Sequence, residues 1–393
     1  MTGRVVWTVP VGASPSSVHE LADALRRATD GSGPAVRPVA AAGPTASVPD
    51  TPVPDGVAVV VATSGSSGDA KHVLLTAEAL RASASATERR LGGPGRWLLA
   101  LPAEHVAGVQ VVLRALLAGA APVVQDLTGG FRPDGFASAA TELPVRARRY
   151  TSLVPTQIAR ILDTGPGAPL DSLVSFDAVL VGGAALDPGL RRRAEDAGVS
   201  VVTTYGMSET CGGCVYDGVA LDGVTVDIES PDPTGAGRIV LGGAVVAAGY
   251  IDPVDDNGAF DGGRFRTGDL GRLDGGRLTV LGRVDDMINT GGEKVAPAAV
   301  ERALLGVPGV RAACVTGLDD AEWGQIVAAL VVADGGADDD TLRSAVRSAS
   351  GRAAVPRVLR RVERIPERGI GKPDRAAVAR LLSGDGSDTL RTR

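Results

Sequence analysis

Lysine is rare in this chain, so each lysine is a candidate for specific chemistry. Only three of the 40 basic residues are lysine: Lys71, Lys294 and Lys372. A lysine ammonium is compact and mobile and contacts one oxygen at a time, whereas the arginine guanidinium is a rigid planar fork. A site that needs the compact ammonium would retain lysine. The segments around these three residues are therefore the first places to look for contacts with a phosphate or a carboxylate.

The segment TSGSSGDAKHV, residues 63–73, combines hydroxyls, glycines and the first lysine. The apolar run GVAVVVAT before it predicts a buried strand, so the segment begins where a strand ends. Glycines let backbone N–H groups converge on a phosphate, hydroxyls add donors, and Lys71 neutralises charge. The order differs from the G-x-x-x-x-G-K-[ST] of a Walker loop, and a flexible linker is the alternative. The preceding strand and the following lysine favour a ligand-binding loop.

Around this loop, strands and helices alternate from residue 57 to residue 206. Apolar runs such as RWLLALP and FDAVLVGGA predict strands, and LTAEALRASASATERRLG predicts a helix with Thr76 as its N-cap. Residues 34–56 are rich in proline, alanine and glycine and are expected to form a loop. Strand–helix units of this length predict a layered, mainly parallel α/β fold.

The second half of the chain changes character. From about residue 218, short strands separated by Gly/Asp turns predict an antiparallel, β-barrel-like module. After Asp286 the pattern becomes α+β. We therefore expect a domain boundary near Arg283–Asp286, with a large N-terminal domain over residues 1–284 and a smaller α+β domain over residues 285–393.

Composition restricts the class of protein. The chain has 393 residues, 44% hydrophobic and 22% charged, with a net charge of −6, which is typical of a globular protein that does not bind nucleic acid. No apolar run approaches the roughly 20 residues of a membrane span, and Pro10 interrupts an N-terminal run too short for a signal peptide. The expected location is the cytoplasm, with no membrane insertion.

The three cysteines, Cys211, Cys214 and Cys314, indicate no disulfide framework. Cys211 and Cys214 form a C-x-x-C, but no second pair of ligands follows to complete a zinc site. A redox pair stays open as an alternative, although no strand–C-x-x-C–helix pattern surrounds it.

Five segments together resemble the adenylate-forming superfamily of acyl-CoA synthetases, luciferases and adenylation domains. TSGSSGDAKHV resembles its phosphate loop, TTYGMSET (203–210) its aromatic-Gly block, and RTGDLG (266–271) its T-G-D block. LGRVDDMINTGGEKVAP (281–297) looks like its hinge and Gly-rich loop, and GIGKPDR (369–375) like its catalytic-lysine segment. The five follow the order of the family and cover the chain from about Val57 to the end.

The resemblance implies a two-step reaction. A carboxylate attacks the α-phosphorus of Mg-ATP, giving an acyl-adenylate and pyrophosphate, and a thiol, usually that of coenzyme A, then attacks the carboxyl carbon. The implied cofactors are ATP, Mg²⁺ and coenzyme A. The implied partners are these molecules and a small carboxylic acid, and a homodimer is one possibility for the oligomeric state.

The resemblance also implies the nucleotide-binding residues. The residues that would cradle the β- and γ-phosphates are Thr63, Ser64, Gly65, Ser66, Ser67, Gly68 and Lys71. Tyr205 would stack on adenine, opposite a wall of Gly182, Gly183 and Ala184, in a block that also contains Thr204, Gly206, Met207 and Ser208. Glu209 would hold Mg²⁺ because a hard cation prefers carboxylate oxygen. Asp269 would accept hydrogen bonds from both ribose hydroxyls, and Arg283 would contact the ribose or a phosphate.

Three further roles follow from the resemblance. Lys372 would bridge the carboxylate and the α-phosphate as charge moves between them, which is electrostatic stabilisation; a solvated lysine at a helix start is the alternative. Asp285 matches the hinge about which the mobile C-terminal domain swings between the two half-reactions. Gly291, Gly292 and Lys294 would then approach the pantetheine tunnel of coenzyme A, where an ordinary turn is the alternative for the two glycines.

Another segment indicates which acid is the substrate. TSLVPTQIARIL (151–162) looks like the S-L-V-P-T-Q segment of the o-succinylbenzoate–CoA ligases of menaquinone biosynthesis, and FDAVLVGGAAL also resembles them. Ser152 and Thr156 are the candidate polar contacts of the acid. His105 matches a family histidine near the acyl pocket, for a catalytic or acid-contacting role, with a surface role as the alternative. The resemblance implies that the chain is shorter at its N-terminus than full-length superfamily members, and such short ligases are expected among the o-succinylbenzoate enzymes.

The expected function is that of an ATP-dependent ligase that converts 2-succinylbenzoate to 2-succinylbenzoyl-CoA with release of AMP and pyrophosphate. Within the class, another aryl or alkyl acid, or a carrier protein in place of coenzyme A, stays open. The alternative from another class is a non-catalytic nucleotide-binding scaffold. The presence of Lys372, Glu209 and Asp269 argues against it.

Overall fold

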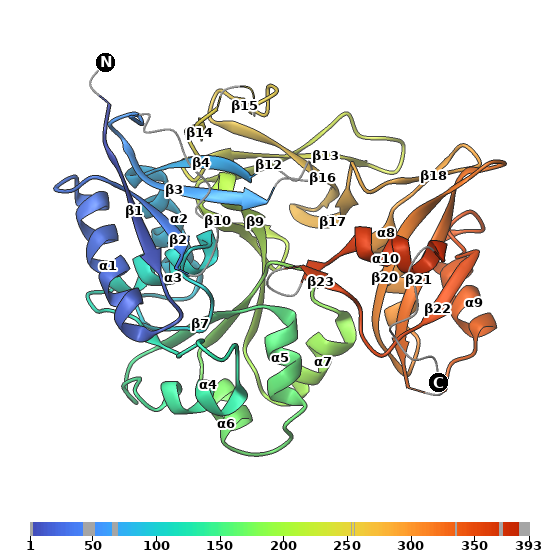
Figure 1. Cartoon of the computed structure of the whole chain (residues 1–393), viewed down its shortest axis with the longest axis horizontal. Helices are drawn as coiled ribbons and strands as arrows, with labels where there is room; N and C mark the ends of the chain where they lie inside the picture. Colours follow the sequence, from blue (N-terminus) through green and yellow to red (C-terminus); the bar gives the residue numbers. More distant parts are fainter. Residues whose placement is uncertain are drawn as a thin grey trace.

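The computed structural model describes residues 3–41, 52–64, 70–252, 254, 256–334, 336–368 and 372–384, and of residues 64, 70, 367, 368 and 372 the backbone alone. Figure 1 shows a larger part formed by the blue to yellow segments and a smaller part formed by the orange and red end of the chain. No helix within the described ranges is long and apolar enough to cross a membrane.

A five-stranded sheet begins the larger part and carries the hairpin of the predicted phosphate loop. Its strands, in spatial order, are β1 (Val6–Val11), β2 (Ala35–Ala40), β3 (Val57–Ser64), β4 (Ala70–Thr76) and β14 (Gly249–Tyr250). The first three strands are parallel, whereas β4 is antiparallel to both of its neighbours. Helix α1 (Pro15–Asp30) joins β1 to β2 and buries Leu21 and Leu25 completely.

The loop expected over residues 34–56 is wrong for residues 35–40, which form β2. This strand runs parallel to β1 along its whole length, and Ala35 and Val36 are fully buried. Proline and alanine disfavour strands by propensity, but burial between two neighbouring strands outweighs that preference. Pro38 is tolerated because β2 pairs with β3 only at Val36. Residues 42–51 lie outside the described ranges.

A twelve-stranded sheet forms the centre of the larger part. Its parallel half has the order β6–β5–β7–β8–β9, which are Val123–Val124, Arg96–Leu99, Arg149–Leu153, Ala178–Val181 and Val201–Met207. The antiparallel half continues through β10, β11, β17, β16, β13 and β12, which are Gly212–Tyr216, Val219–Ala220, Arg277–Arg283, Arg264–Asp274, Ala236–Gly243 and Val224–Glu229, and β15 (Phe260–Asp261) pairs with β16. The change predicted near residue 218 is therefore a change of strand direction within one sheet.

The parallel strands are covered by helices on both faces, as the alternation of their side chains requires. Trp97 and Leu99 of β5 join the core that contains α2 (Ala77–Arg90) and α3 (Val106–Leu117), whereas Leu98 joins the core of the opposite face. That second core contains α4 (Pro133–Ala140), α5 (Pro155–Leu162), α6 (Ala168–Val174) and α7 (Pro188–Asp196). Thr76 caps α2 as predicted, since its hydroxyl accepts the Ala79 N–H at 3.0 Å.

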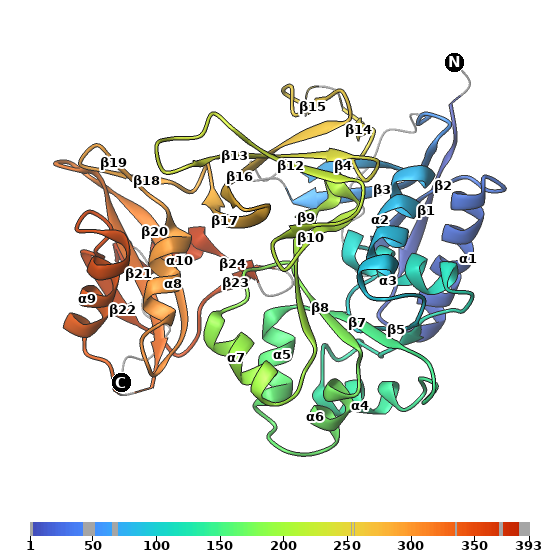
Figure 2. The same cartoon turned by 180° about the vertical axis from the view of Figure 1, so that it is seen from behind.

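The smaller part has its own sheet, seen at the left of Figure 2. Its strands are β18 (Ile288–Thr290), β19 (Glu293–Val295), β20 (Val310–Asp320), β21 (Gly324–Ala333) and β22 (Val358–Arg361), and its helices are α8 (Pro297–Leu305), α9 (Asp339–Ser350) and α10 (Arg375–Ser383). Helices α8 and α9 pack on one core and α10 on another. The predicted fold class, an α/β domain followed by a smaller α+β domain, is confirmed. The boundary between residues 284 and 285 stays a prediction.

Candidate active site

Many of the predicted site residues gather at one edge of the central sheet. β5, β7, β8 and β9 are parallel neighbours, so their carboxyl ends meet at the same edge. Ligands bind at this edge in open α/β sheets. The predicted residues that lie in these strands or in the segments that follow them are His105, Ser152, Thr156, Gly182, Gly183, Ala184, Thr204, Tyr205, Gly206, Met207, Ser208 and Glu209.

The antiparallel half of the sheet adds the predicted ribose-binding carboxylate. The Tyr205 hydroxyl donates to Asp269 Oδ2 at 2.8 Å, and Arg283 Nη1 lies 3.7 Å from Asp269 Oδ1. Burial, with Asp269 as the second cause, raises the pKa of Tyr205 far above its usual value, so the phenol stays protonated and donates. The carboxylate is thus held beside an aromatic ring, an arrangement able to accept hydrogen bonds from the hydroxyls of a ribose.

Close approaches of neighbouring atoms and backbone conformation explain three glycines of the predicted nucleotide site. A Cβ at Gly182 would lie 2.4 Å from Thr204 Oγ1, and one at Gly206 would lie 2.1 Å from the Gly212 carbonyl oxygen. Gly183 has a φ of 80°, in the left-handed region that favours glycine. The turn after β8 therefore lies directly against β9, which brings the predicted wall beside Tyr205.

Glu209 has the environment expected of a metal-binding carboxylate. It lies in the short 3₁₀ helix η1 (Ser208–Thr210) and is only 9% exposed. Its Oε1 accepts the Tyr250 hydroxyl at 2.7 Å, and among the described residues no arginine or lysine forms an ion pair with it. A buried carboxylate that forms no ion pair with a described residue suits a hard cation such as Mg²⁺. Since the described residues contain no cluster of three metal-ligating side chains, phosphate and water oxygens would complete the Mg²⁺ shell.

The predicted phosphate loop connects β3 to β4. Thr63 and Lys71 are opposite each other in this hairpin, and Thr63 Oγ1 donates to the Lys71 carbonyl at 3.4 Å. Gly65, Ser66, Ser67 and Gly68 lie outside the described residues, as does the side chain of Ser64.

The predicted catalytic lysine lies in a small hairpin. Its strands β23 (Glu367–Arg368) and β24 (Lys372–Pro373) pair with Arg368 opposite Lys372, and residues 369–371 and the Lys372 side chain lie outside the described residues. Figures 1 and 2 both show this hairpin between the larger and the smaller part.

Arg375 anchors this hairpin to the smaller part. It forms ion pairs with Glu301 at 2.7 Å and Asp286 at 3.3 Å and donates to the Val315 carbonyl. The backbone that bears Lys372 is thereby tied to α8 and to the residue after Asp285. At the predicted hinge itself, Arg283 Nη2 lies 3.1 Å from Asp285 Oδ2, an exposed pair that contributes little stability.

The predicted coenzyme A loop is the turn of the β18–β19 hairpin. Gly291 and Gly292 have φ values of 57° and 82°, and these two residues and Lys294 are exposed. The Trp323 ring lies against Gly291, since a Cβ there would be 2.7 Å from Trp323 Cε3. Figure 2 places β18 and β19 at the outer side of the smaller part, so the structure does not bring this loop together with the nucleotide residues.

Two family models match this chain. The model of AMP-binding enzymes matches residues 9–251, and that of the AMP-binding enzyme C-terminal domain matches residues 299–372. The chain belongs to the AMP-binding enzyme family.

Sequence relatives of this AMP-binding enzyme carry the name of one activity. A Mycobacterium tuberculosis (strain CDC 1551 / Oshkosh) protein named "Probable 2-succinylbenzoate--CoA ligase" is 48% identical over 339 residues, which cover 85% of this chain and 86% of that protein. A 2-succinylbenzoate–CoA ligase of Enterococcus faecalis is 30% identical over 303 residues, covering 71% of this chain and 60% of that protein.

Solved structures of the same fold include two kinds of enzyme. The o-succinylbenzoate CoA synthetase (MenE) of Bacillus subtilis, solved with the acyl-adenylate OSB-AMP, has a TM-score of 0.71 and 25% identity, and the match covers 91% of this chain and 76% of that one. The amide bond synthetase McbA of Marinactinospora thermotolerans has a TM-score of 0.74 and 29% identity, covering 96% and 79%.

This AMP-binding enzyme also carries a buried polar pair on α3 that the sequence reasoning missed. Gln110 is 1% exposed, and neither its Oε1 nor its Nε2 has a hydrogen-bond partner. Arg114 follows one turn later and is 7% exposed; its Nη2 donates to the Tyr216 hydroxyl at 3.3 Å, and its guanidinium lies 5.3 Å from the centre of the Trp97 ring. No carboxylate among the described residues forms an ion pair with Arg114. The available signal was two polar residues four apart in the apolar helix VAGVQVVLRALL.

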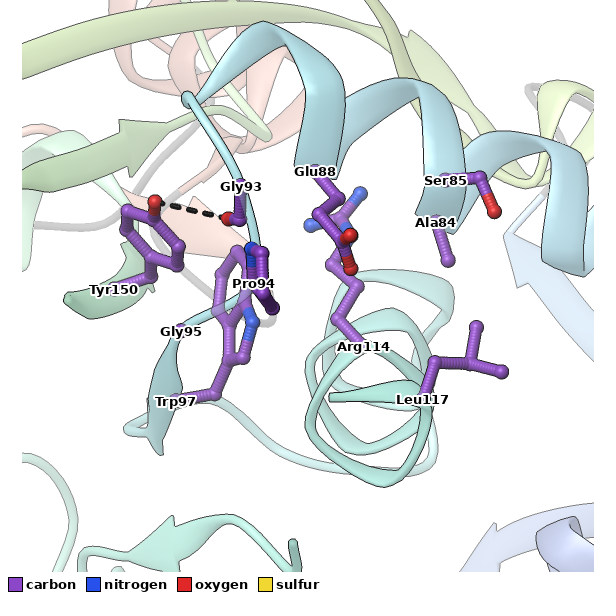
Figure 3. Close-up of a pocket in the computed structure, with 10 residues that line it drawn as sticks. All are labelled: Ala84, Ser85, Glu88, Gly93, Pro94, Gly95, Trp97, Arg114, Leu117 and Tyr150. Carbon is purple, nitrogen blue, oxygen red and sulfur yellow. Dashed lines mark hydrogen bonds between the residues drawn. The ribbon is translucent and has the colours of Figure 1, made fainter. Parts of the chain in front are cut away.

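Figure 3 shows Arg114 beside a small recess between α2, α3 and the turn at Gly93–Gly95. The Tyr150 hydroxyl closes one side of it by donating to the Gly93 carbonyl at 3.1 Å. None of the residues predicted from the sequence to bind the nucleotide lines this recess.

The cysteines do not form a redox pair in this structure. Cys211 and Cys214 are both fully buried and free. Burial raises the pKa of the Cys214 thiol to about 12 and that of Cys211 further still, so neither is a thiolate near neutral pH. Since metal binding and thiol–disulfide exchange both require the thiolate, this environment favours a structural role.

Proposed function

We propose that this AMP-binding enzyme is an ATP-dependent ligase that joins 2-succinylbenzoate to coenzyme A. In the first step a carboxylate oxygen of the acid attacks the α-phosphorus of ATP and pyrophosphate leaves. In the second step the sulfur of coenzyme A attacks the acyl carbon and AMP leaves. The names of the M. tuberculosis and E. faecalis relatives and the acyl-adenylate bound by the B. subtilis synthetase support this choice of acid.

The observation that carries the adenylation step is the assembly of Tyr205, Asp269 and Glu209 beside one sheet edge. Asp269, oriented by Tyr205, would bind the ribose, and Glu209 would hold the Mg²⁺ that neutralises phosphate charge when bound. We further propose that Lys372 brings its ammonium to the carboxylate and the α-phosphate, where one well-placed donor lowers the barrier by about 3–4 kcal/mol.

Arg114 supports a dicarboxylic acid as the substrate. 2-Succinylbenzoate carries two carboxylates, and the one that is not activated stays ionised. A buried guanidinium without a carboxylate partner is costly, and it is stabilised when an anion pairs with it. We therefore propose Arg114 as the cation for the second carboxylate, with Gln110 donating to an oxygen of the acid. Ser152, which is buried, Thr156 and the exposed His105 remain candidates for further contacts with the acid.

A panel of acids tests the proposed activity. The purified enzyme is incubated with ATP, Mg²⁺, coenzyme A and one acid at a time, and thioesters are identified by mass spectrometry. We expect turnover of 2-succinylbenzoate to exceed that of benzoates and fatty acids by orders of magnitude. Parallel reactions replace coenzyme A with an amine or a carrier protein, because a structural relative makes amide bonds. Strong turnover of other acids, with none of 2-succinylbenzoate, would refute the proposed substrate.

The proposed location is the cytoplasm, where ATP and coenzyme A are both supplied. A homodimer remains a prediction, which sedimentation velocity at micromolar concentration would test.

A further inference from the structure

Tyr250 contacts two parts of the proposed ATP site that come from distant segments of the chain. Its hydroxyl donates to Glu209 Oε1 at 2.7 Å, and Lys71 Nζ lies 5.0 Å from the centre of its ring. We propose that Tyr250 is a positioning residue that holds the metal-binding carboxylate through its hydroxyl and the phosphate-binding ammonium through its ring. This inference rests on the proposed function, which assigns Glu209 to Mg²⁺ and Lys71 to the triphosphate.

The backbone fixes the position of Tyr250 relative to both partners. In the pairing of β14 with β4, Tyr250 is opposite Val73, two residues after Lys71. On the other side of the same segment, the Ala247 N–H donates to the Glu209 carbonyl at 2.9 Å. The four residues 247–250 therefore link the phosphate-loop hairpin to η1, and Tyr250 is the last residue of this link.

Aromatic packing fixes the orientation of the ring. Phe260 of β15 meets Tyr250 edge to face, with ring centres 5.2 Å apart, and itself packs at 4.8 Å against Phe265. Phe265 is 5% exposed and lies on β16, the strand that also carries Asp269. Because these contacts hold the ring, its face toward Lys71 and its hydroxyl toward Glu209 are set before any ligand binds.

The two contacts act on different charges. The hydroxyl donates to one oxygen of Glu209 and so orients the carboxylate, with Oε2 as the oxygen directed to a cation. The ring face attracts the Lys71 ammonium, as expected of a cation–π contact at this distance. Removing the hydroxyl should therefore disturb the metal contact alone, whereas removing the ring should disturb the metal and the triphosphate contacts together.

Two variants separate these effects. Tyr250→Phe removes the hydroxyl and keeps the ring, and Tyr250→Leu removes both. Tyr150→Phe is the matched control. It removes a phenolic hydroxyl that donates to the Leu91 and Gly93 carbonyls, and this residue contacts neither Lys71 nor Glu209.

ATP affinity is measured by calorimetry, with EDTA and over a series of Mg²⁺ concentrations. Mn²⁺ binding to the ATP complex is measured by electron paramagnetic resonance. Circular dichroism and thermal unfolding verify that each variant is folded.

For Tyr250→Phe we expect the half-saturating Mg²⁺ concentration to rise roughly tenfold, the effect of one lost hydrogen bond to a charged group, with metal-free ATP affinity unchanged. For Tyr250→Leu we expect, in addition, roughly two- to fivefold weaker metal-free ATP binding. A Tyr250→Phe variant with wild-type Mg²⁺ dependence would overturn the proposal, as would equal losses in both variants and in Tyr150→Phe. These measurements contain no acid, so they remain decisive if the enzyme acts on an acid other than 2-succinylbenzoate.

Discussion

The Tyr205 hydroxyl donates a hydrogen bond to Asp269 at 2.8 Å, joining β9 to β16 across 64 positions of sequence. The ring predicted to stack on adenine therefore also orients the carboxylate predicted to bind the ribose. The other carboxylate oxygen lies 3.7 Å from Arg283, so Asp269 is held from two sides. These three residues lie on β9, β16 and β17, and the antiparallel half of the sheet brings them together.

Tyr205→Phe should weaken ATP binding without blocking chemistry. The variant keeps the ring but leaves one oxygen of Asp269 without its donor, and a hydrogen bond to a charged group contributes about 1.5–3 kcal/mol. We expect the KM for ATP to rise about tenfold or more with kcat changed less than threefold. Steady-state release of pyrophosphate measures both constants. A KM equal to that of the wild type would show that Asp269 does not depend on this hydroxyl.

The order of elements was predictable from the sequence where local patterns were strong. Apolar runs bounded by glycine identified β5, β8 and β9, and Thr76 marked the start of α2, because burial and capping leave a signal within a few residues. The expectation failed for β2, whose one proline and two alanines form a strand only because β1 and β3 flank it. Pairing partners tens of residues away leave no such local signal.

Arg375→Gln should slow adenylation by releasing the hairpin that bears Lys372. The substitution removes the cation shared by Glu301 and Asp286, which are 16% and 33% exposed, and partial exposure reduces the loss of stability to about 1–3 kcal/mol. We expect acid-dependent pyrophosphate exchange to fall at least about tenfold in kcat with little change in KM for ATP. Arg375→Lys should restore part of the rate, and Arg380→Gln, on the exposed side of α10, should have none of this effect.

Lys372→Ala provides the reference for that experiment. If Lys372 supplies the charge in the transition state, this variant should abolish exchange and leave ATP binding largely intact, as measured by calorimetry. Undiminished exchange would contradict the catalytic role of Lys372. An Arg375→Gln variant that loses ATP affinity in proportion to its rate would instead indicate a general loss of structure.

The residues of the candidate site were likewise predictable only where the signal lies within a short segment of sequence. The glycine, tyrosine and carboxylate blocks were found because the chemistry needs those residue types at fixed spacing. Arg114 and Tyr250 were missed because their importance lies in what surrounds them: a buried guanidinium without a carboxylate partner, and a phenol between a carboxylate and an ammonium. Residue type alone does not reveal whether an arginine within an apolar helix is exposed or buried.

Arg114→Gln should weaken binding of the substrate carboxylate that is not activated, without affecting the carboxylate that is. Loss of the guanidinium leaves the ionised second carboxylate without a cation, and a hydrogen-bonded charge pair contributes about 2–5 kcal/mol. We expect the KM for 2-succinylbenzoate to rise at least about thirtyfold, and Arg114→Lys to recover part of it. The control is the monoacid analogue that keeps the carboxylate to be activated and lacks the second carboxylate. This analogue should react equally well with the wild type and the variant. A rise in its KM as large as that for 2-succinylbenzoate would show that Arg114 does not bind the second carboxylate.

The buried thiols should make the protein less stable at alkaline pH. Burial raises the pKa of Cys214 and of Cys314 from the ordinary value of 9.0 to about 12. Between these values the unfolded chain has lost the thiol protons and the folded chain retains them, so the free energy of unfolding falls as pH rises, by up to about 1.4 kcal/mol per pH unit for each thiol. Urea unfolding between pH 7.5 and 10.5 measures this slope, which Cys214→Ala should reduce.

The same thiols should be unreactive in the folded protein. At pH 8 they should resist Ellman's reagent until urea unfolds the chain and exposes them. Rapid labelling of native Cys211 and Cys214 would revive the redox interpretation of the C-x-x-C.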